Sequence, residues 1–351
     1  MSADCRRAAM SPALSCGPRT LADQHSVALF VLASMAIVWA ACIVAMRFPI
    51  QCSMVAVFAL AGPHNWMEAR YFLTRYPAKW GKLKRFFVLS IVGVLGLTCG
   101  FASIPWLGKQ LEWAPAEWLS ALTCWNLLLI AWVYLLVTIR AKQPPRRDWG
   151  WAAPIALSAS GVAFLFPGQM SVLWIYLHPL MGLWILDREI IRSREGLSTA
   201  YRMCVAVLPL ALCAIVWGNL GSPDFNATID ASDRVVEQIV THSGAAWVPW
   251  LSSHSLVSVH AFLELIHYGV WLIAIPVVSG RVLKPVSQSI PLAKRSPFFR
   301  RTVVLFLATG FGAVIALWIG FHVDYAATRD LYFTIAMAHV LAEVPFLLRS
   351  L

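Results

Sequence analysis

Charged residues are scarce in this chain of 351 residues. Only 13% of its residues are Asp, Glu, Lys or Arg and 59% are hydrophobic, whereas a soluble domain carries roughly 25% charged residues. The mean hydropathy is +0.69, and apolar stretches recur from one end of the sequence to the other. This composition excludes a disordered chain, a soluble protein and a soluble protein with one membrane anchor. It predicts an all-α, polytopic integral membrane helical bundle.

Motifs of several common protein classes are also absent. The eight cysteines include no CxxC pair, so neither a metal knuckle nor a disulfide framework is expected. The sequence contains no P-loop, no GxGxxG in a suitable context, no HExxH and no GxSxG. Its net charge of +11 lacks the aromatic or groove-reading context of a nucleic-acid site. We therefore expect no nucleic-acid partner.

Apolar runs of about 20 residues predict ten transmembrane helices. Residues 1–25 are polar enough to stay outside the bilayer as an N-terminal tail, and residues 26–351 form a single transmembrane domain with a long outer loop at 220–255. The predicted spans are 26–46, 49–72, 86–106, 118–139, 150–167, 170–187, 199–219, 256–279, 302–321 and 327–347.

The basic residues predict the orientation of these spans. Of the 28 lysines and arginines, 24 fall in alternate connections and termini, and four fall in the others. Because positive residues are retained on the cytoplasmic side, both termini are expected to be cytoplasmic, and the number of spans is expected to be even. The same residues form a basic collar for anionic lipid headgroups on that side. The expected location is a bacterial inner (plasma) membrane.

Ionisable residues inside the spans are few, and their spacing is informative. A charged group deep in a bilayer is costly, so each one requires a partner or a function. Three histidines are each followed by a glutamate four positions later, as His64–Glu68, His260–Glu264 and His339–Glu343. Residues i and i+4 share one face of a helix. A carboxylate is therefore expected beside each imidazole, where it orients the ring as carboxylates do in metal sites.

The predicted topology brings histidines of four spans to similar depth, because these spans all run in the same direction. We predict that they bind a metal; they are His64, His178, His267 and His339. Glu68, Glu264 and Glu343 are the candidate catalytic carboxylates. His260 lies about 10 Å from His267 along one helix, so it is assigned to the surroundings of the metal. Further candidates for these surroundings are Asn65, Asp187 and Tyr268.

Four neutral imidazoles backed by carboxylates suit non-haem iron, and they also accept copper or zinc. An all-histidine site with open positions favours an oxidoreductase that uses dioxygen on a lipid-soluble substrate. Two other functions stay open. Two of the histidines are possible axial ligands of haem in an electron-transfer protein, and the three glutamates are a possible relay in a proton- or ion-coupled transporter. Buried histidines that only pack and form hydrogen bonds are the structural alternative.

The sequence resembles the Brp/Blh-type bacterial membrane dioxygenases, which cleave β-carotene to retinal. Pro63-His64 with Glu68 resembles the first motif of that family, and His260 with His267 resembles its histidine-rich later span. His339 with Glu343, followed by Phe346 and Arg349, resembles its final span. This resemblance implies a histidine-bound iron, dioxygen as co-substrate and a carotenoid-like apolar substrate.

Overall fold

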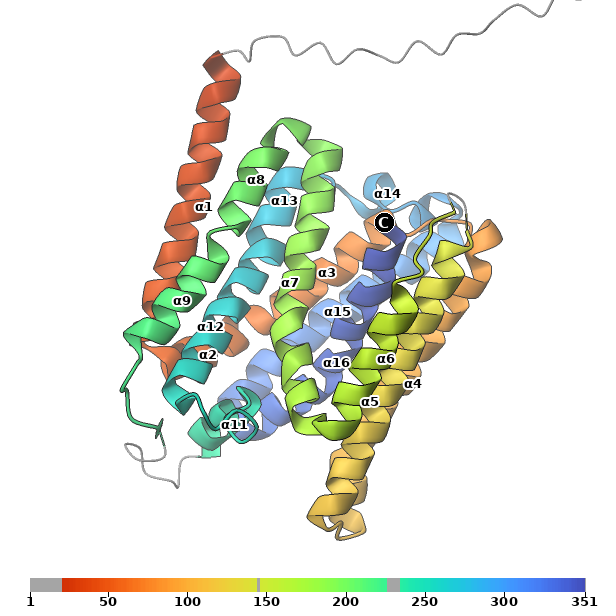
Figure 1. The fold of residues 1–351 in the computed structure, drawn as a ribbon. Helices are drawn as coiled ribbons and strands as arrows, with labels where there is room; N and C mark the ends of the chain where they lie inside the picture. The colour runs from red at the N-terminus through yellow and green to blue at the C-terminus, as the bar shows by residue number, and fades with distance from the viewer. Residues whose placement is uncertain (1–20, 144–145, 226–233, 351) are drawn as a thin grey trace, which may run out of the picture.

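The computed structural model describes residues 21–143, 146–225 and 234–350, and within these ranges the chain is helical and contains no strand. The helices pack side by side into a bundle (Figure 1). Among the described residues, eight helical units have the length and apolar composition of membrane spans. The chain is therefore an all-α integral membrane protein, as its composition predicts. The eight units are α1 (Leu21–Arg47), α4 (Lys84–Gln110), α5 (Pro115–Ala141), α7 (Pro167–Ser193), α8 with α9 (Ser198–Val205, Leu208–Gly218), α12 with α13 (Ser253–Gly269, Ile275–Ser279), α15 (Pro297–Val323) and α16 (Tyr325–Ser350).

Two of the ten predicted spans are not among these eight. Residues 49–72 lie in a continuous helical segment, formed by α2 (Pro49–Ala56), a π-helical turn (Val57–Ala61) and α3 (Gly62–Arg75). The sequence of α3 is more polar than that of the eight apolar helices. The other, α6 (Ala152–Leu165), is apolar and has 14 residues. At ~1.5 Å per residue it is about 21 Å long, shorter than the roughly 30 Å of a bilayer core. Ten spans thus stay a prediction.

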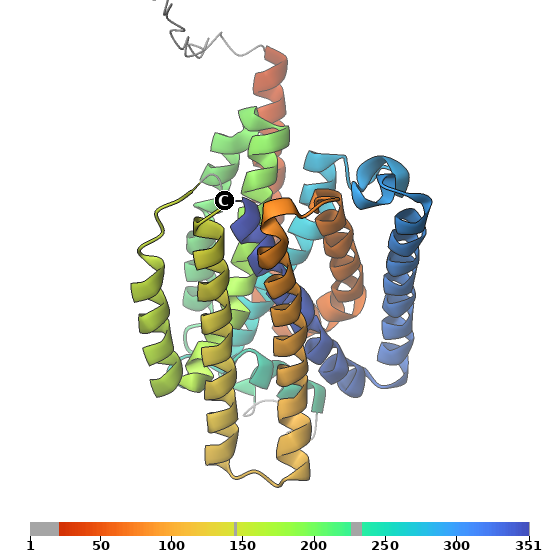
Figure 2. The same cartoon turned by 90° about the vertical axis from the view of Figure 1, so that its right-hand side faces the viewer.

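The helices that carry the four predicted ligands run in the same direction through the bundle. Figure 1 shows α2 leading into α3, α7, α12 leading into α13, and α16 all rising toward the end of the bundle where the chain finishes. The described N-terminal helix α1 begins at this same end, as both views show (Figures 1 and 2). The hairpin of α4 and α5 turns at the opposite end.

The predicted tail and outer loop are described in part. Residues 1–20 and 226–233 lie outside the described ranges, and α1 begins at Leu21, inside the predicted tail. Within the loop at 220–255, the helix α11 (Arg234–His242) packs against α12 and α16. It lies at the end of the bundle opposite the C-terminus (Figure 1).

The helix α12 occupies the centre of the bundle. It contacts α1, α2, α7, α9 and α11, and nearly all of its side chains are buried. The six cysteines in the described part of the chain are free thiols. A central helix surrounded on all sides provides an interior position where polar side chains are shielded from both water and lipid.

Candidate metal centre

The four predicted histidines come from four different helices. His64 lies in the first turn of α3 and His267 near the end of α12, whereas His178 and His339 lie in the middle of α7 and α16. The histidines of α3 and α12 are each close to a π-helical turn, at Val57–Ala61 and Val270–Ala274. Such turns re-aim side chains and are frequent at functional sites. Here they adjust the rotation of two helices just where each presents an imidazole.

The four imidazole rings lie together. The ring centroid of His64 is 5.3 Å from that of His267 and 5.2 Å from that of His339. The ring of His178 is 4.3 Å from that of His267 and 5.0 Å from that of His339. The Nε2 atoms of His178 and His339 are 3.3 Å apart. The structure therefore brings together all four histidines that the sequence analysis assigned to the metal.

Potential ligand atoms form two overlapping groups, with the atoms of each group within 4.8 Å of one another. One group contains His64, Glu68, His267 and His339, and the other contains His178, His267 and Glu343. His267 belongs to both groups. Two of the three candidate catalytic glutamates thus lie close enough to share a metal with the histidines.

Several ring nitrogens at the centre lack protein partners. Nε2 of His64 and both ring nitrogens of His267 make no hydrogen bond with a described residue, and these side chains are buried. By contrast, Nδ1 of His64 lies 3.2 Å from the carbonyl oxygen of Leu60. Donation of the Nδ1 proton to this carbonyl leaves Nε2 with a lone pair, which is the form of imidazole that binds a metal.

Two glutamate side chains are buried at the centre. Glu68 is 1% exposed and Glu343 is 0% exposed, and no lysine or arginine of the described ranges forms an ion pair with either. The two oxygens of Glu68 have no hydrogen-bond partner there. A buried carboxylate without a partner is costly. A divalent cation between the histidines would balance two such charges.

One of the three glutamates pairs differently from the sequence prediction. Of the three pairs at i and i+4, His260–Glu264 is within ion-pair distance, with Nδ1 3.6 Å from Oε2. Glu343 instead lies across the helix interface beside His178, with 3.0 Å between Oε2 and Nδ1. The prediction that Glu343 orients His339 through their shared helix face is wrong, because α7 packs closely on α16 and places His178 nearer to that carboxylate.

The remaining predicted residues divide between the centre and other places. The ring of Tyr268 is 4.4 Å from that of His64, and Nδ2 of Asn65 is 3.5 Å from the hydroxyl of Tyr332. His260 and Glu264 line the same cavity as the four histidines. Asp187 does not belong to the centre.

The sequence predicts Asp187 close to the metal, and this prediction is wrong. The residue is nine positions beyond His178 on α7, about 13 Å along the axis. It accepts hydrogen bonds from Arg202 at 2.9 and 3.3 Å and lies 3.8 Å from Arg188. It therefore forms a charge cluster near the end of the helix.

A cavity of about 1150 Å³ extends from the four histidines. Its apolar wall comes from α4, α5, α7 and α16, and includes Phe101, Trp125, Leu129, Trp174, Met337 and Val340. Its other end is polar and is lined by residues of α11, of which Arg234, Glu237 and Thr241 are exposed. The cavity thus connects the histidines to an apolar chamber and to one end of the bundle.

Sequence reasoning missed several residues that shape the centre. Trp271 is 1% exposed, and its ring is 6.4 Å from that of His267. A Cβ atom placed on Gly182 of α7 would be 3.1 Å from Nδ1 of His267 and 3.5 Å from the Trp271 indole nitrogen. A tryptophan or a glycine in an apolar run carries no distinctive signal, so only the packing of α7 on α12 reveals these two roles.

A second polar group lies in the same cavity on the α11 side, and it was also missed. Arg329 is 2% exposed, and its guanidinium stacks 4.6 Å over the ring of Phe333. His242 of α11, predicted only as a loop residue, has its ring 5.0 Å from that of His260. Burial, together with the nearby His260 and Arg329, holds the pKa of His242 well below its usual range. Both residues line the cavity.

Fold and site together define a helical integral membrane protein with a buried cluster of four histidines and two carboxylates. Comparison of the chain with models of protein families, with characterised proteins and with solved structures finds no match. The function is therefore argued from the site itself.

Proposed function

We propose that this protein is a membrane-embedded oxidoreductase that uses non-haem iron and dioxygen to oxidise a lipid-soluble, carotenoid-like substrate. One observation carries the proposal. Imidazoles from four helices converge in one cavity, beside two buried carboxylates that no basic residue of the described chain neutralises. A divalent iron ion would satisfy the free ring nitrogens and the charge of both carboxylates at once.

The proposed chemistry, rather than the donor set, leads to iron. Copper and zinc accept the same ligands, but a zinc site does not exchange electrons, so oxidation by dioxygen requires a redox-active metal, for which we propose iron. Bound iron would supply redox chemistry with dioxygen. His64, His267 and His339 would hold it, and Glu68 lies within reach as a further ligand. His178, whose Nε2 is 3.3 Å from that of His339, would complete the set of four histidines.

The close packing of the rings supports a single ion rather than haem. A porphyrin requires a wide, flat slot between its two axial ligands. Here each ring lies 4.3–5.3 Å from two of the others, so the remaining histidines occupy the space that the macrocycle would need. This geometry weighs against the electron-transfer alternative.

The surrounding side chains have separate tasks in this proposal. Glu343 orients the ring of His178 through Nδ1, and the carbonyl of Leu60 orients His64. The apolar wall of the cavity holds the substrate and excludes water from the reacting end. The volume of the cavity, about 1150 Å³, is larger than that of most small-ligand sites, which is roughly 300–1,000 Å³. This volume supports the choice of a large substrate such as a polyene.

The lipid-facing side of α7 offers the substrate a route from the bilayer. Leu177, Leu180 and Trp184 line the cavity, and they are 37%, 44% and 43% exposed. Their position on the outside of the bundle places the apolar chamber next to the acyl chains. A membrane-dissolved substrate therefore enters laterally, without passing through water.

The topology expected from the sequence belongs to the same proposal. We infer ten spans, which are the eight apolar helices together with the α2–α3 segment and α6. Both termini lie in the cytoplasm of a bacterium. The support is the alternation of basic residues along the chain and the position of the start of α1 and the end of α16 at one end of the bundle (Figure 1). The resemblance to the Brp/Blh-type dioxygenases supports the choice of substrate.

Metal content and absorption of the detergent-purified protein test the proposal. We expect near-stoichiometric iron without the intense visible band of haem. The iron should be lost in His339→Ala and retained in His322→Ala, because His322 is an exposed residue at the end of α15. Equal iron content in the two variants, or no binding by wild type after anaerobic loading with ferrous iron, would refute a histidine-bound iron. A haem band would favour electron transfer instead.

Activity is tested separately from metal binding. Iron-loaded protein in lipid nanodiscs is mixed with a carotenoid under oxygen, and loss of the polyene absorption is followed together with oxygen uptake. Dependence of both signals on iron and on His339 supports the oxygenase. Bound iron without consumption of either reactant would contradict the carotenoid-like substrate but leave the metal site intact.

A further inference from the structure

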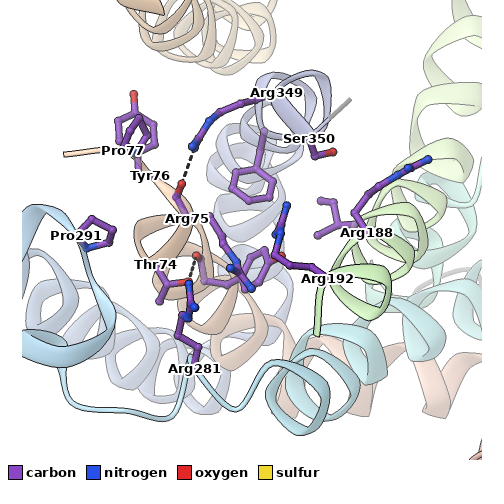
Figure 3. Close-up of a pocket in the computed structure, with 13 residues that line it drawn as sticks. Thr74, Arg75, Tyr76, Pro77, Arg188, Arg192, Arg281, Pro291, Arg349 and Ser350 are labelled. Carbon is purple, nitrogen blue, oxygen red and sulfur yellow. Dashed lines mark hydrogen bonds between the residues drawn. The ribbon is translucent and has the colours of Figure 1, made fainter. Parts of the chain in front are cut away.

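Arginines gather in a separate pocket at the end of the bundle where the C-terminus lies. The pocket has a volume of about 390 Å³ and is formed by the ends of α3, α7 and α16 together with the connection after α13 (Figure 3). Its five arginines are Arg75, Arg188, Arg192, Arg281 and Arg349, and none of its lining residues is acidic. The pocket therefore concentrates positive charge in a small space.

Two nearby carboxylates neutralise only part of this charge. Glu189, which is 0% exposed, forms ion pairs with Arg75 and Arg192 and also accepts a hydrogen bond from the Tyr71 hydroxyl at 2.9 Å. Asp187 lies nearer to Arg202 than to Arg188. The arginines of the pocket thus carry a net positive charge that the carboxylates of the described residues do not balance.

Capping of helix ends does not account for the whole cluster. Arg349 donates a hydrogen bond of 2.5 Å to the carbonyl oxygen of Arg75, which stabilises the C-terminus of α3. However, the side chain of Arg75 is only 10% exposed, and its Nε has no partner in the described part of the chain. Like charges brought together repel each other, so the arrangement calls for an anion in the pocket.

We propose that this pocket binds the phosphate group of an anionic ligand. Guanidinium groups match the oxygens of phosphate through paired hydrogen bonds, and a phosphate carries enough charge to engage several of them. Tyr71, Ile185 and Phe346 also line the pocket. Their apolar surface suits the first methylenes of a phospholipid, whereas free phosphate shares only the charged contacts.

The experiment compares three probes added to the full-length protein in neutral detergent. They are dioctanoyl phosphatidic acid, dioctanoylglycerol and inorganic phosphate, and unfolding is followed by tryptophan fluorescence. We expect phosphatidic acid to raise the melting temperature in a saturable manner and dioctanoylglycerol, which lacks only the phosphate, to have no such effect. If inorganic phosphate stabilised the protein as much as phosphatidic acid does, the ligand would be a soluble phosphate. If inorganic phosphate had no effect, the ligand would be a lipid.

Two double variants test the location of binding. Arg192→Gln with Arg281→Gln removes two pocket arginines and leaves the pair of Arg75 with Glu189 in place. Arg300→Gln with Arg301→Gln removes the same charge from exposed positions on α15. Loss of charged hydrogen bonds should weaken phosphate binding by about tenfold or more in the first variant only. No stabilisation by any phosphate probe, or equal weakening in both variants, would overturn the proposal, whatever the metal content of the histidine centre.

Discussion

Replacement of Glu343 by glutamine separates a metal centre from a purely structural polar cluster. The substitution keeps the size of the side chain and removes one negative charge from a position that is 0% exposed and 3.0 Å from Nδ1 of His178. In the proposed centre this charge both orients a ligand and balances the cation. Loss of such a group costs about 10–100-fold in metal affinity, which corresponds to about 1.4–2.8 kcal/mol.

The same substitution should have the opposite effect without metal. A buried carboxylate that has lost its cation destabilises the fold, and its replacement by a neutral amide removes the cost of burying that charge. We therefore expect Glu343→Gln to unfold at higher temperature than wild type when both are metal-free. With saturating ferrous iron, wild type should gain more stability than the variant does.

The assay is a pair of measurements on each protein. Anaerobic titration with ferrous iron gives the dissociation constant, and thermal unfolding is recorded with and without the metal. Glu195→Gln provides the matched control, because Glu195 is exposed and lies in the short helix Glu195–Leu197, outside the cavity. If Glu343→Gln destabilised the metal-free protein as well, the carboxylate would serve the fold rather than a cation, and the charge argument would be refuted.

Two further predictions concern the surroundings of the centre. Gly182→Ala should displace the His267 ring by a few tenths of an ångström, because the new Cβ would be 3.1 Å from Nδ1. Titration with iron should then show an affinity that is lower by about tenfold. The control Gly161→Ala, whose new Cβ meets no atom within 4 Å, should leave the affinity unchanged. The depressed pKa of His242 means that the unfolded chain binds its proton more readily, so the stability is complete above about pH 6.5 and is lost as the pH falls below that value. Between pH 7.5 and 5.5, the melting temperature should therefore fall less in His242→Gln than in wild type. In His25→Gln, whose imidazole is exposed on α1, it should fall as much as in wild type. An equal fall in all three proteins would contradict the role of His242.

Composition and spacing were sufficient for the membrane class and for the set of histidines. A bilayer requires long apolar helices with all backbone groups bonded internally, so an all-α membrane protein follows from the sequence alone. The few ionisable residues within such helices identify a candidate site in advance, because their burial is costly. For this reason His64, His178, His267 and His339 could be selected from nine histidines before any contact was known.

Only the tertiary structure decided which side chains meet across helices. Glu343 contacts His178 rather than His339, Asp187 lies away from the centre, and Gly182 packs on His267. The physical reason is that lipid and protein interior are both apolar, so the hydrophobic pattern of a membrane helix barely records its rotation. Rotation and crossing of the helices are set by the packing of the whole bundle, and they determine which of the available polar groups become neighbours.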